Sequence, residues 1–193
     1  MAEVAIRIPK ERRPRDATRA ASRTAILDAA RRVAARTGAR ELSLRGVAAE
    51  AGFAPAALYG YFRNKDELLL ALAADDLTAL ARVMRDAGGL AGAGIAALDL
   101  LKGAETMAAA SGAFAAGQGG DAERLFNGRL IAALKALSDA SGLPTGSRAH
   151  QCDVVLLASA LAGLALFARS GRLGALGFTP DEMIARLDSR FRG

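Results

Sequence analysis

Residues 42–62 most constrain the fold, because two short helical patterns follow each other there with little chain between them. Ser43 is suited to cap the first helix, and Gly52 ends it in the left-handed conformation that glycine adopts at least cost. Pro55 has the fixed φ angle that suits the first position of a second helix, which we expect to run to Phe62. Two short helices joined by a tight, glycine-containing turn predict a helix-turn-helix.

Helical periodicity continues on both sides of this motif. Thr18 is the expected N-cap of a helix of about five turns that ends at Gly38 and carries apolar residues on one face. Asn64 is the expected cap of a further helix at residues 65–87. The motif therefore lies between two longer helices.

Glycines divide the rest of the chain into helix-sized pieces. We expect the two glycine-rich stretches, near 88–94 and 112–120, to be mobile. Alanine and leucine dominate the composition and tryptophan is absent, so strong helix formers outweigh β-branched and aromatic residues. The fold is therefore predicted to be all-α. Its further helices are expected at about 95–111, 121–141, 147–170 and 180–190.

Positive charge is concentrated near the N-terminus. Residues 1–65 hold 14 Lys and Arg against 6 Asp and Glu, whereas the remainder holds 12 and 14. Within this region, residues 1–17 combine arginines with Pro9 and Pro14, which predicts a mobile basic arm. A basic end joined to a neutral or acidic remainder is typical of a nucleic-acid-binding domain, although a merely solvated basic surface has the same composition. The expected regions are an arm at 1–17, a DNA-binding domain at 18–65 and a larger domain at 66–193.

Residues 42–68, LSLRGVAAEAGFAPAALYGYFRNKDEL, resemble the DNA-binding segment of the TetR family of bacterial repressors. Ser43 stands at the family's Ser/Thr cap, and Ala51 and Gly52 stand at its Ala-Gly corner. The other matching positions are Val47, Ala48, Leu58, Tyr59, Phe62, Lys65, Glu67 and Leu68. The resemblance covers about a quarter of the chain. It implies an all-α protein with an N-terminal three-helix helix-turn-helix DNA-binding domain and a C-terminal helical ligand-binding and dimerisation domain.

The resemblance implies a homodimer that binds double-stranded DNA, with contact residues in and beside the second short helix. Ser43 and the backbone amides at the start of the first short helix suit a phosphate, because a helix N-terminus is positively polarised. Lys65 supplies a point charge for another phosphate. Arg45 is the expected base reader, since a guanidinium can bond guanine O6 and N7 together. The predicted DNA-binding residues are Ser43, Arg45, Ala54, Pro55, Ala56, Ala57, Tyr59, Tyr61 and Lys65.

Several of these residues also have a purely structural interpretation. Ser43 could serve only as a helix cap, and Tyr59 could fill the space beside the first helix. Arg45 could be a solvated surface charge. Leu58 and Phe62 are assigned to the core.

Small apolar residues depart from the family's pattern in the second short helix. Ala54 replaces the usual serine, and Ala56 and Ala57 stand where glycine and threonine are common. None of them donates a side-chain hydrogen bond, and Gly60 loosens the helix by about 1 kcal/mol relative to alanine. We therefore expect base reading to depend on Arg45, on methyl contacts from Ala56 or Ala57 to thymine, and on arm arginines in the minor groove.

The most apolar run, residues 154–168, is expected to form a buried core or interface helix. It is shorter than the roughly 20 residues of a membrane span. Together with the helix at 121–141 it is the predicted dimer interface, because small residues such as Ala162 and Gly163 permit close approach. Burial inside one subunit is the alternative.

The resemblance also implies a pocket for a small effector in the C-terminal half. The scarcity of ionisable groups there predicts a mostly apolar ligand. The candidate lining residues, which could equally be ordinary core residues, are Met84, Met107, Phe114, Leu125, Phe126 and Phe167.

Catalytic and metal-binding functions find little support in the residues. His150 and the single cysteine, Cys152, have no third or fourth ligand nearby, so a metal site is not expected. Asp75 and Asp76 are adjacent on a helix, so they should face different directions and be solvated. No second histidine, phosphate-binding loop or activated nucleophile is present, and we expect neither an enzyme nor a cofactor.

The expected location is the cytoplasm, without membrane attachment. A single cysteine excludes an internal disulfide and fits a reducing compartment. Residues 1–25 are rich in arginine but lack the apolar segment of an export signal.

Two other functions stay open on sequence alone. A nonspecific architectural DNA-binding protein would share the basic arm but would have no use for the acidic half, residues 66–193. An enzyme or carrier with a vestigial DNA-binding end predicts weak DNA affinity with little salt dependence. Several phosphate contacts require a steep dependence instead.

Overall fold

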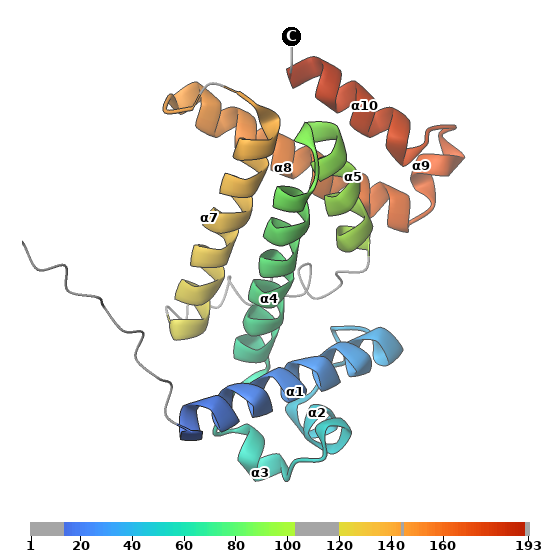
Figure 1. Cartoon of the computed structure of the whole chain (residues 1–193). Coiled ribbons are helices and arrows are strands. Elements are labelled where there is room, and N and C mark those ends of the chain that lie inside the picture. Colours follow the sequence, from blue (N-terminus) through green and yellow to red (C-terminus); the bar gives the residue numbers. More distant parts are fainter. Residues whose placement is uncertain (1–13, 103–119, 144, 192–193) are drawn as a thin grey trace, which may run out of the picture.

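The computed structural model describes residues 14–102, 120–143 and 145–191, and every regular element in these ranges is a helix. Figure 1 shows a small N-terminal head, made of α1 to α3, from which α4 leads into a larger body made of α5 to α10. The helices are α1 (Pro14–Thr37), α2 (Leu44–Ala51), α3 (Pro55–Leu58), α4 (Lys65–Asp86), α5 (Gly89–Lys102), α7 (Asp121–Ser141), α8 (Arg148–Arg169), α9 (Arg172–Ala175) and α10 (Pro180–Phe191).

The predicted helix-turn-helix is present, with the predicted caps. Ser43 Oγ accepts a hydrogen bond of 3.1 Å from the Gly46 N–H, and Gly52 ends α2 with a φ of 71°. A residue with a side chain would be strained at this corner, which is why glycine stands there. α3 is shorter than predicted, since it ends at Leu58 and not at Phe62. The N–H groups of Tyr61 and Phe62 both turn back onto the Leu58 carbonyl, at 2.9 Å.

The predicted start of α1 is wrong. The helix begins at Pro14, so Thr18 lies inside it, and residues 14–17 belong to the helix and not to an extended arm. Proline is tolerated in the first turn because the N–H it lacks has no partner there. Residues 1–13 of the predicted arm lie outside the described residues.

α4 belongs to both parts of the molecule. Asn64 caps it as predicted, accepting a 2.8 Å hydrogen bond from the Glu67 N–H. Its first turns, with Leu68 and Leu72, are buried in the core of the head, whereas Leu77 and Met84 are buried in the core of the body. The head core therefore extends beyond residue 65.

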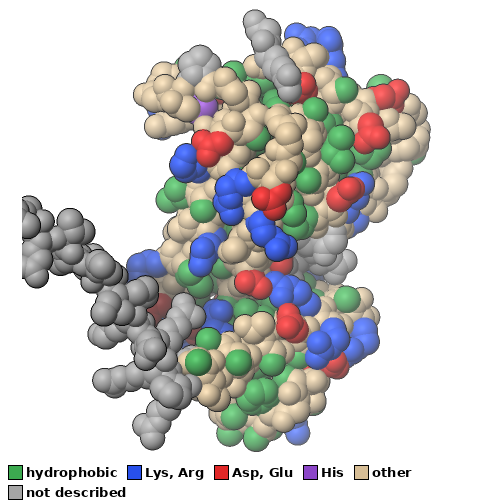
Figure 2. Space-filling view, in the orientation of Figure 1, with side chains coloured by type: hydrophobic (Ala, Val, Ile, Leu, Met, Phe, Trp, Pro, Cys, Tyr) green, Lys and Arg blue, Asp and Glu red, His purple; other side chains and the backbone are tan. Residues whose placement is uncertain are grey.

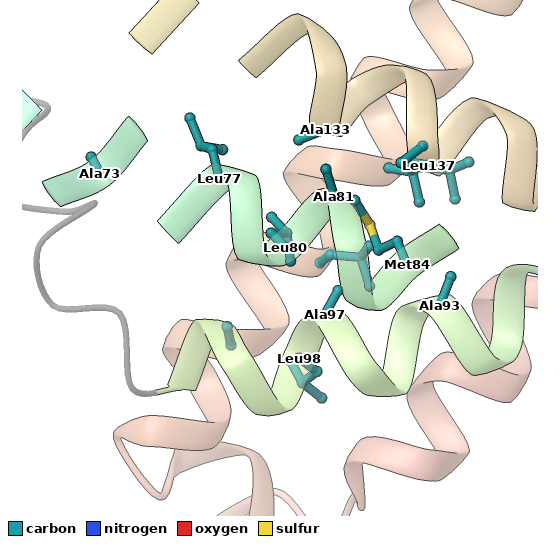
Figure 3. Close-up of a cluster of buried hydrophobic side chains, with 14 of the residues drawn as sticks. Ala73, Leu77, Leu80, Ala81, Met84, Ala93, Ala97, Leu98, Ala133 and Leu137 are labelled. Atoms are coloured by element: carbon teal, nitrogen blue, oxygen red, sulfur yellow. The ribbon is translucent and has the colours of Figure 1, made fainter. Parts of the chain in front are cut away.

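The body is built around the packing of α4 against α7, with α5, α8 and α10 covering one end (Figure 1). Its core combines leucine side chains with small ones at the contacts between helices. Figure 3 shows Ala93 and Ala97 of α5 facing Met84 on α4, with Ala133 of α7 close to α4. Alanine at a contact lets helix axes approach closely, so apolar surface is buried without large side chains.

The glycine-rich stretch at 88–94 was expected to be mobile, and this is wrong, because α5 begins at Gly89. Gly94 faces α10, and a Cβ placed on it would lie 3.1 Å from two methyl carbons of Ile184. Close packing therefore favours glycine here, because a larger residue would have to displace the Ile184 side chain. The stretch near 112–120 and the second half of the predicted helix at 95–111 lie outside the described residues, except Gly120.

α8 lies within one residue of the predicted bounds, 147–170, at each end, and it is longer than the apolar run at 154–168. Among the described residues it is the one helix long and apolar enough to cross a membrane, and most of its apolar stretch is not buried within the chain. The short length of the apolar run therefore does not exclude a membrane-spanning helix. One such helix is weak evidence for a membrane, because an interface helix has the same composition.

Candidate nucleic-acid interface

The outer surface of the head is formed by α2, α3 and the turn that follows. Ala54, Pro55, Ala56 and Ala57 are all exposed, whereas Leu58 is completely buried and holds α3 to the core. Figure 2 shows hydrophobic side chains gathered at this end of the molecule, with basic side chains beside them. α3 is thus presented outward, as a recognition helix must be.

Arg45 projects from the first turn of α2 on this surface. It is exposed and has no ion-pair or hydrogen-bond partner among the described residues. Ser43 is exposed as well, and its Oγ lone pair is used by Gly46, which leaves its own O–H free to donate. Both side chains are therefore available to a ligand.

The two tyrosines have different environments. Tyr59 is 60% exposed, so the alternative in which it fills space beside α1 does not fit its position. Tyr61 is half-buried, and its ring packs edge-on against Phe53 with centroids 6.3 Å apart. Tyr61 is thus the tyrosine that supports the turn.

Arg19 connects α1 to the end of the recognition helix, a contact that the sequence analysis missed. Its Nη2 donates a 2.9 Å hydrogen bond to the Gly60 carbonyl, and its guanidinium lies 5.2 Å from the centroid of the Tyr61 ring. One turn further along α1, Arg23 lies at the same distance over Phe62. Because α3 has only four residues, these contacts position it relative to α1.

Lys65 is less free than the sequence predicts. Its Nζ donates a hydrogen bond to the Arg40 carbonyl at the turn before α2, and the residue is half-buried. The ammonium group has three donors, so two stay available beside that bond.

Glu50 joins α2 to α1 through two arginines. Its carboxylate accepts a 2.6 Å bond from Arg36 and a 2.7 Å bond from Arg32. Hydrogen bonds from Arg36 and Arg32 lower the pKa of Glu50 to about 2. The carboxylate therefore stays ionised at any physiological pH and fixes how α2 lies on α1.

Asp75 and Asp76 are not merely solvated, contrary to prediction. Arg31 Nη2 on α1 reaches Asp75 at 2.6 Å and Asp76 at 3.2 Å, so one guanidinium bridges both carboxylates of α4. Arg31 also pairs with Asp28 on its own helix. The head is thereby attached to α4 by charge as well as by its apolar core.

The candidate effector residues do not form one site in the described part of the chain. Met84 and Phe126 are buried in the core of the body, whereas Leu125 and Phe167 are exposed. Met107 and Phe114 lie outside the described residues. A small, mostly polar pocket instead lies between the start of α4 and the start of α7, with Asn64, Asp66 and Glu123 in its lining.

His150 and Cys152 do not form a pair. His150 is 8% exposed, and its Nε2 lies 2.7 Å from Ser138 Oγ on α7, while Cys152 is exposed on α8. Within the described ranges no group of three or more metal-ligating side chains is present.

A capped helix, a glycine corner and an outward recognition helix beside the unpaired Arg45 are the features of a helix-turn-helix DNA-binding domain. Residues 26–72 match the family model described as bacterial regulatory proteins, tetR family. No curated protein sequence matches the chain.

Solved structures of similar fold cover nearly the whole chain. A TetR transcriptional regulator from Rhodococcus sp. RHA1 is 20% identical, with a TM-score of 0.66 over 90% of this chain and 97% of that chain. Another transcriptional regulator from Rhodococcus sp. RHA1 is 26% identical, with a TM-score of 0.60 over 88% and 94%. The regulator FadR from Bacillus subtilis, solved in complex with stearoyl-CoA, is 16% identical, with a TM-score of 0.59 over 87% and 96%. Residues 26–72 therefore match the TetR-family DNA-binding segment that the resemblance implied, and the fold of the whole chain is similar to that of these regulators.

Proposed function

We propose that the protein is a repressor that binds a palindromic operator as a homodimer and is released by a small, mostly apolar effector. The observation that carries this proposal is the outward position of α3 beside the unpaired Arg45, in a head that matches the family. The three regions expected from the sequence are proposed with bounds that follow the helices: a basic arm that ends before α1, a DNA-binding domain made of α1 to α3 and the first turns of α4, and a regulatory and dimerisation domain that follows. In this role the protein regulates transcription and does not catalyse a reaction. The role also implies that the protein acts in the cytoplasm.

The exposed side chains of the head have distinct proposed roles. Arg45 reads a base in the major groove, and Ser43 donates its hydroxyl to a phosphate. Tyr59 reaches a further phosphate, because its hydroxyl lies on a largely exposed ring. Lys65 and Tyr61 contribute from the edge of the surface, where each is also held by the protein. The groove-facing residues of α3 and its cap are Ala54, Pro55, Ala56 and Ala57.

The proposed dimer interface is the exposed stripe of α8. The buried residues Val154, Leu157 and Leu161 attach one face of α8 to its own subunit. The opposite face is exposed and almost entirely apolar, with small residues at its centre. The members of this stripe are Cys152, Val155, Leu156, Ser159, Ala162, Leu166 and Phe167. A second copy would remove this apolar surface from water, which accounts for α8 without a membrane.

The outward face of α7 supports a role in the interface less well. Ile131 is exposed and apolar, but Arg124, Arg129 and Lys135 are exposed close to it on the same helix. Charged side chains are depleted at the centre of stable interfaces. α7 therefore belongs to the edge of the proposed interface.

A mostly apolar effector is consistent with the apolar body. Met84 and Phe126 are the described candidate residues that lie in its core. The similar FadR structure contains stearoyl-CoA, a ligand with a long apolar chain, although its identity to this chain is low. The effector would act by changing the separation of the two heads.

Selection from random duplexes, followed by binding in excess nonspecific DNA, tests the DNA-binding proposal. A repressor keeps one palindromic sequence under competition and loses affinity steeply as salt rises, because several phosphate contacts release counterions. An architectural protein would lose the selected sequence to the competitor. A carrier with a vestigial head would show weak binding with a shallow salt dependence.

Matched charge reversals locate the contact on the head. Arg45→Glu should abolish selective binding, whereas Arg186→Glu should leave it intact, because Arg186 is exposed on α10 at the far end of the molecule (Figure 1). Equal loss of operator binding in the Arg45→Glu and Arg186→Glu variants would contradict the assignment of α2 and α3 as the DNA contact.

Thermal-shift screening of apolar ligands with the operator present then tests the proposed effector.

A further inference from the structure

The outward surface of the recognition helix has no polar side-chain atom. Ala54, Pro55, Ala56 and Ala57 form this surface, and all four are exposed. Ala54 stands at the N-cap and makes no side-chain hydrogen bond there. Direct hydrogen-bond reading of bases by side chains is therefore impossible from this helix, and it must come from the flanks, where Arg45 and Tyr59 are exposed.

Short side chains also determine how closely the helix can approach DNA. An alanine side chain extends only to its Cβ, so contact with a base edge requires the backbone of α3 to lie deep in the groove. The Arg19 contacts to the Gly60 carbonyl and to the Tyr61 ring support the end of this very short helix in its outward position. The head thus presents a rigid apolar surface.

This apolar surface lies beside basic side chains (Figure 2). The two together indicate a ligand that has an apolar group with negative charges on either side of it. In the major groove the one apolar group of the four bases is the C5-methyl of thymine. We propose that α3 recognises thymine C5-methyl groups in each half-site, through Ala56, Ala57 and the Pro55 ring. This proposal rests on the proposed function and names the chemistry that the same surface reads.

Methyl reading has a consequence that hydrogen-bond reading does not share. Removal of the C5-methyl leaves a gap against Ala56 or Ala57, while the base pair keeps all its hydrogen-bonding groups. Addition of a C5-methyl to cytosine supplies the same apolar group on a different base pair. The head is therefore expected to respond to the methyl group itself.

Deoxyuridine substitution in the selected operator tests this directly, because deoxyuridine lacks only the methyl group of thymidine. We expect binding to weaken about fourfold for each contacted position, which corresponds to one buried methyl group. Thymidines outside the segment that α3 covers should not respond. At a contacted position replaced by a C·G pair, 5-methylcytosine should restore part of the lost affinity.

A double-mutant cycle assigns the effect to α3. Ala57→Gly and Ala56→Gly each remove one protein methyl group, so deoxyuridine should have little further effect at the position that the residue contacts. Ala185→Gly, on exposed α10, is the matched control and should leave the response to deoxyuridine unchanged. The cycle also cancels the cost of glycine to helix stability.

The outcomes separate this inference from the proposed function. Selection of one operator that binds equally well with deoxyuridine at every thymidine overturns methyl reading and leaves the repressor proposal standing. A response to deoxyuridine that is additive with both glycine variants also overturns it, because the methyl groups are then read elsewhere. Failure to select any operator overturns both proposals.

Discussion

The head and the body hold their helices together by different means. In the head, ion pairs join separate helices, since Arg32 and Arg36 of α1 bind Glu50 of α2, and Arg31 binds two carboxylates of α4. In the described part of the body, each ion pair joins residues within a single helix. Its helices are held to one another mainly by buried leucine and alanine.

This difference affects what each region can do. Charge-assisted hydrogen bonds are directional, so they fix the orientation of α1, α2 and α4 in the head. Apolar burial is not directional, so the orientation of the helices in the body depends on how their side chains pack. The surface of the head is thus fixed by hydrogen-bonded charges, whereas a change of packing in the body can alter how its helices lie.

The largest expected effect comes from breaking the apolar surface of the body. Leu156→Glu combined with Leu166→Glu places charges on the exposed stripe of α8 and should convert a dimer into monomers. Because two linked half-sites bind far more tightly than one, operator affinity should fall by about 100-fold or more. Sedimentation and operator titration measure the two effects.

Ile131→Glu on α7 is the comparison for this change, because Ile131 is exposed outside the stripe, at the proposed edge of the interface. It should weaken the dimer far less than the double substitution on α8. Monomers from this variant would place the centre of the interface on α7 instead.

Core truncation in the body gives the next largest effect. Leu98→Ala removes a side chain of α5 that is almost fully buried in the core of the body (Figure 3), and it should cost about 2–5 kcal/mol of unfolding free energy. Leu176→Ala, at an exposed position, should cost less than about 0.5 kcal/mol. Similar losses in urea unfolding for both variants would show that the body does not depend on apolar packing.

A smaller effect is expected from the charge contact between head and α4. Arg31→Gln should lower operator affinity by about fivefold, which corresponds to roughly 1 kcal/mol for a partly exposed ion pair. Arg85→Gln, on an exposed arginine of α4 without an ion pair among the described residues, is the control. In a cycle with Asp75→Asn, additive losses would show that the pair does not orient the head.

The smallest effect is a dependence on pH. The pKa of Glu50 is about 2 in the folded head, below the ordinary value of 4.5, so its contribution to stability is complete above pH 4.5. It is lost as the pH falls from 4.5 through about 2. The stability difference between the wild type and Glu50→Gln should therefore be constant near neutrality and shrink in this acid range. A difference that stays unchanged down to pH 2 would contradict the assigned bonds from Arg36 and Arg32.

The local features of the helix-turn-helix could be predicted from the sequence, because they depend on neighbouring residues. Ser43, Gly52 and Asn64 act as caps through contacts within a few positions, and each was predicted correctly. The choice of Leu58 and Phe62 as core residues is also confirmed. Local chemistry therefore determined the caps and the corner of the helix-turn-helix.

Features set by distant contacts could not be predicted in this way. Gly94 lies in a helix and lets Ile184 of α10 pack closely against it, whereas a glycine-rich sequence alone favours a loop. Asp75 and Asp76 point to one arginine because that long side chain reaches both from another helix. The sequence pattern also could not decide that Tyr61, rather than Tyr59, packs on Phe53.

The sharing of α4 between two cores has a consequence for the DNA that a dimer would accept. A continuous helix has a fixed rise of about 1.5 Å per residue, so the head can tilt with α4 but cannot move along it. In the proposed dimer, opposite tilts change the gap between the two recognition helices and leave each reading surface unaltered. An effector would then shift the preferred number of base pairs between half-sites, while the bases preferred within each half-site stay the same.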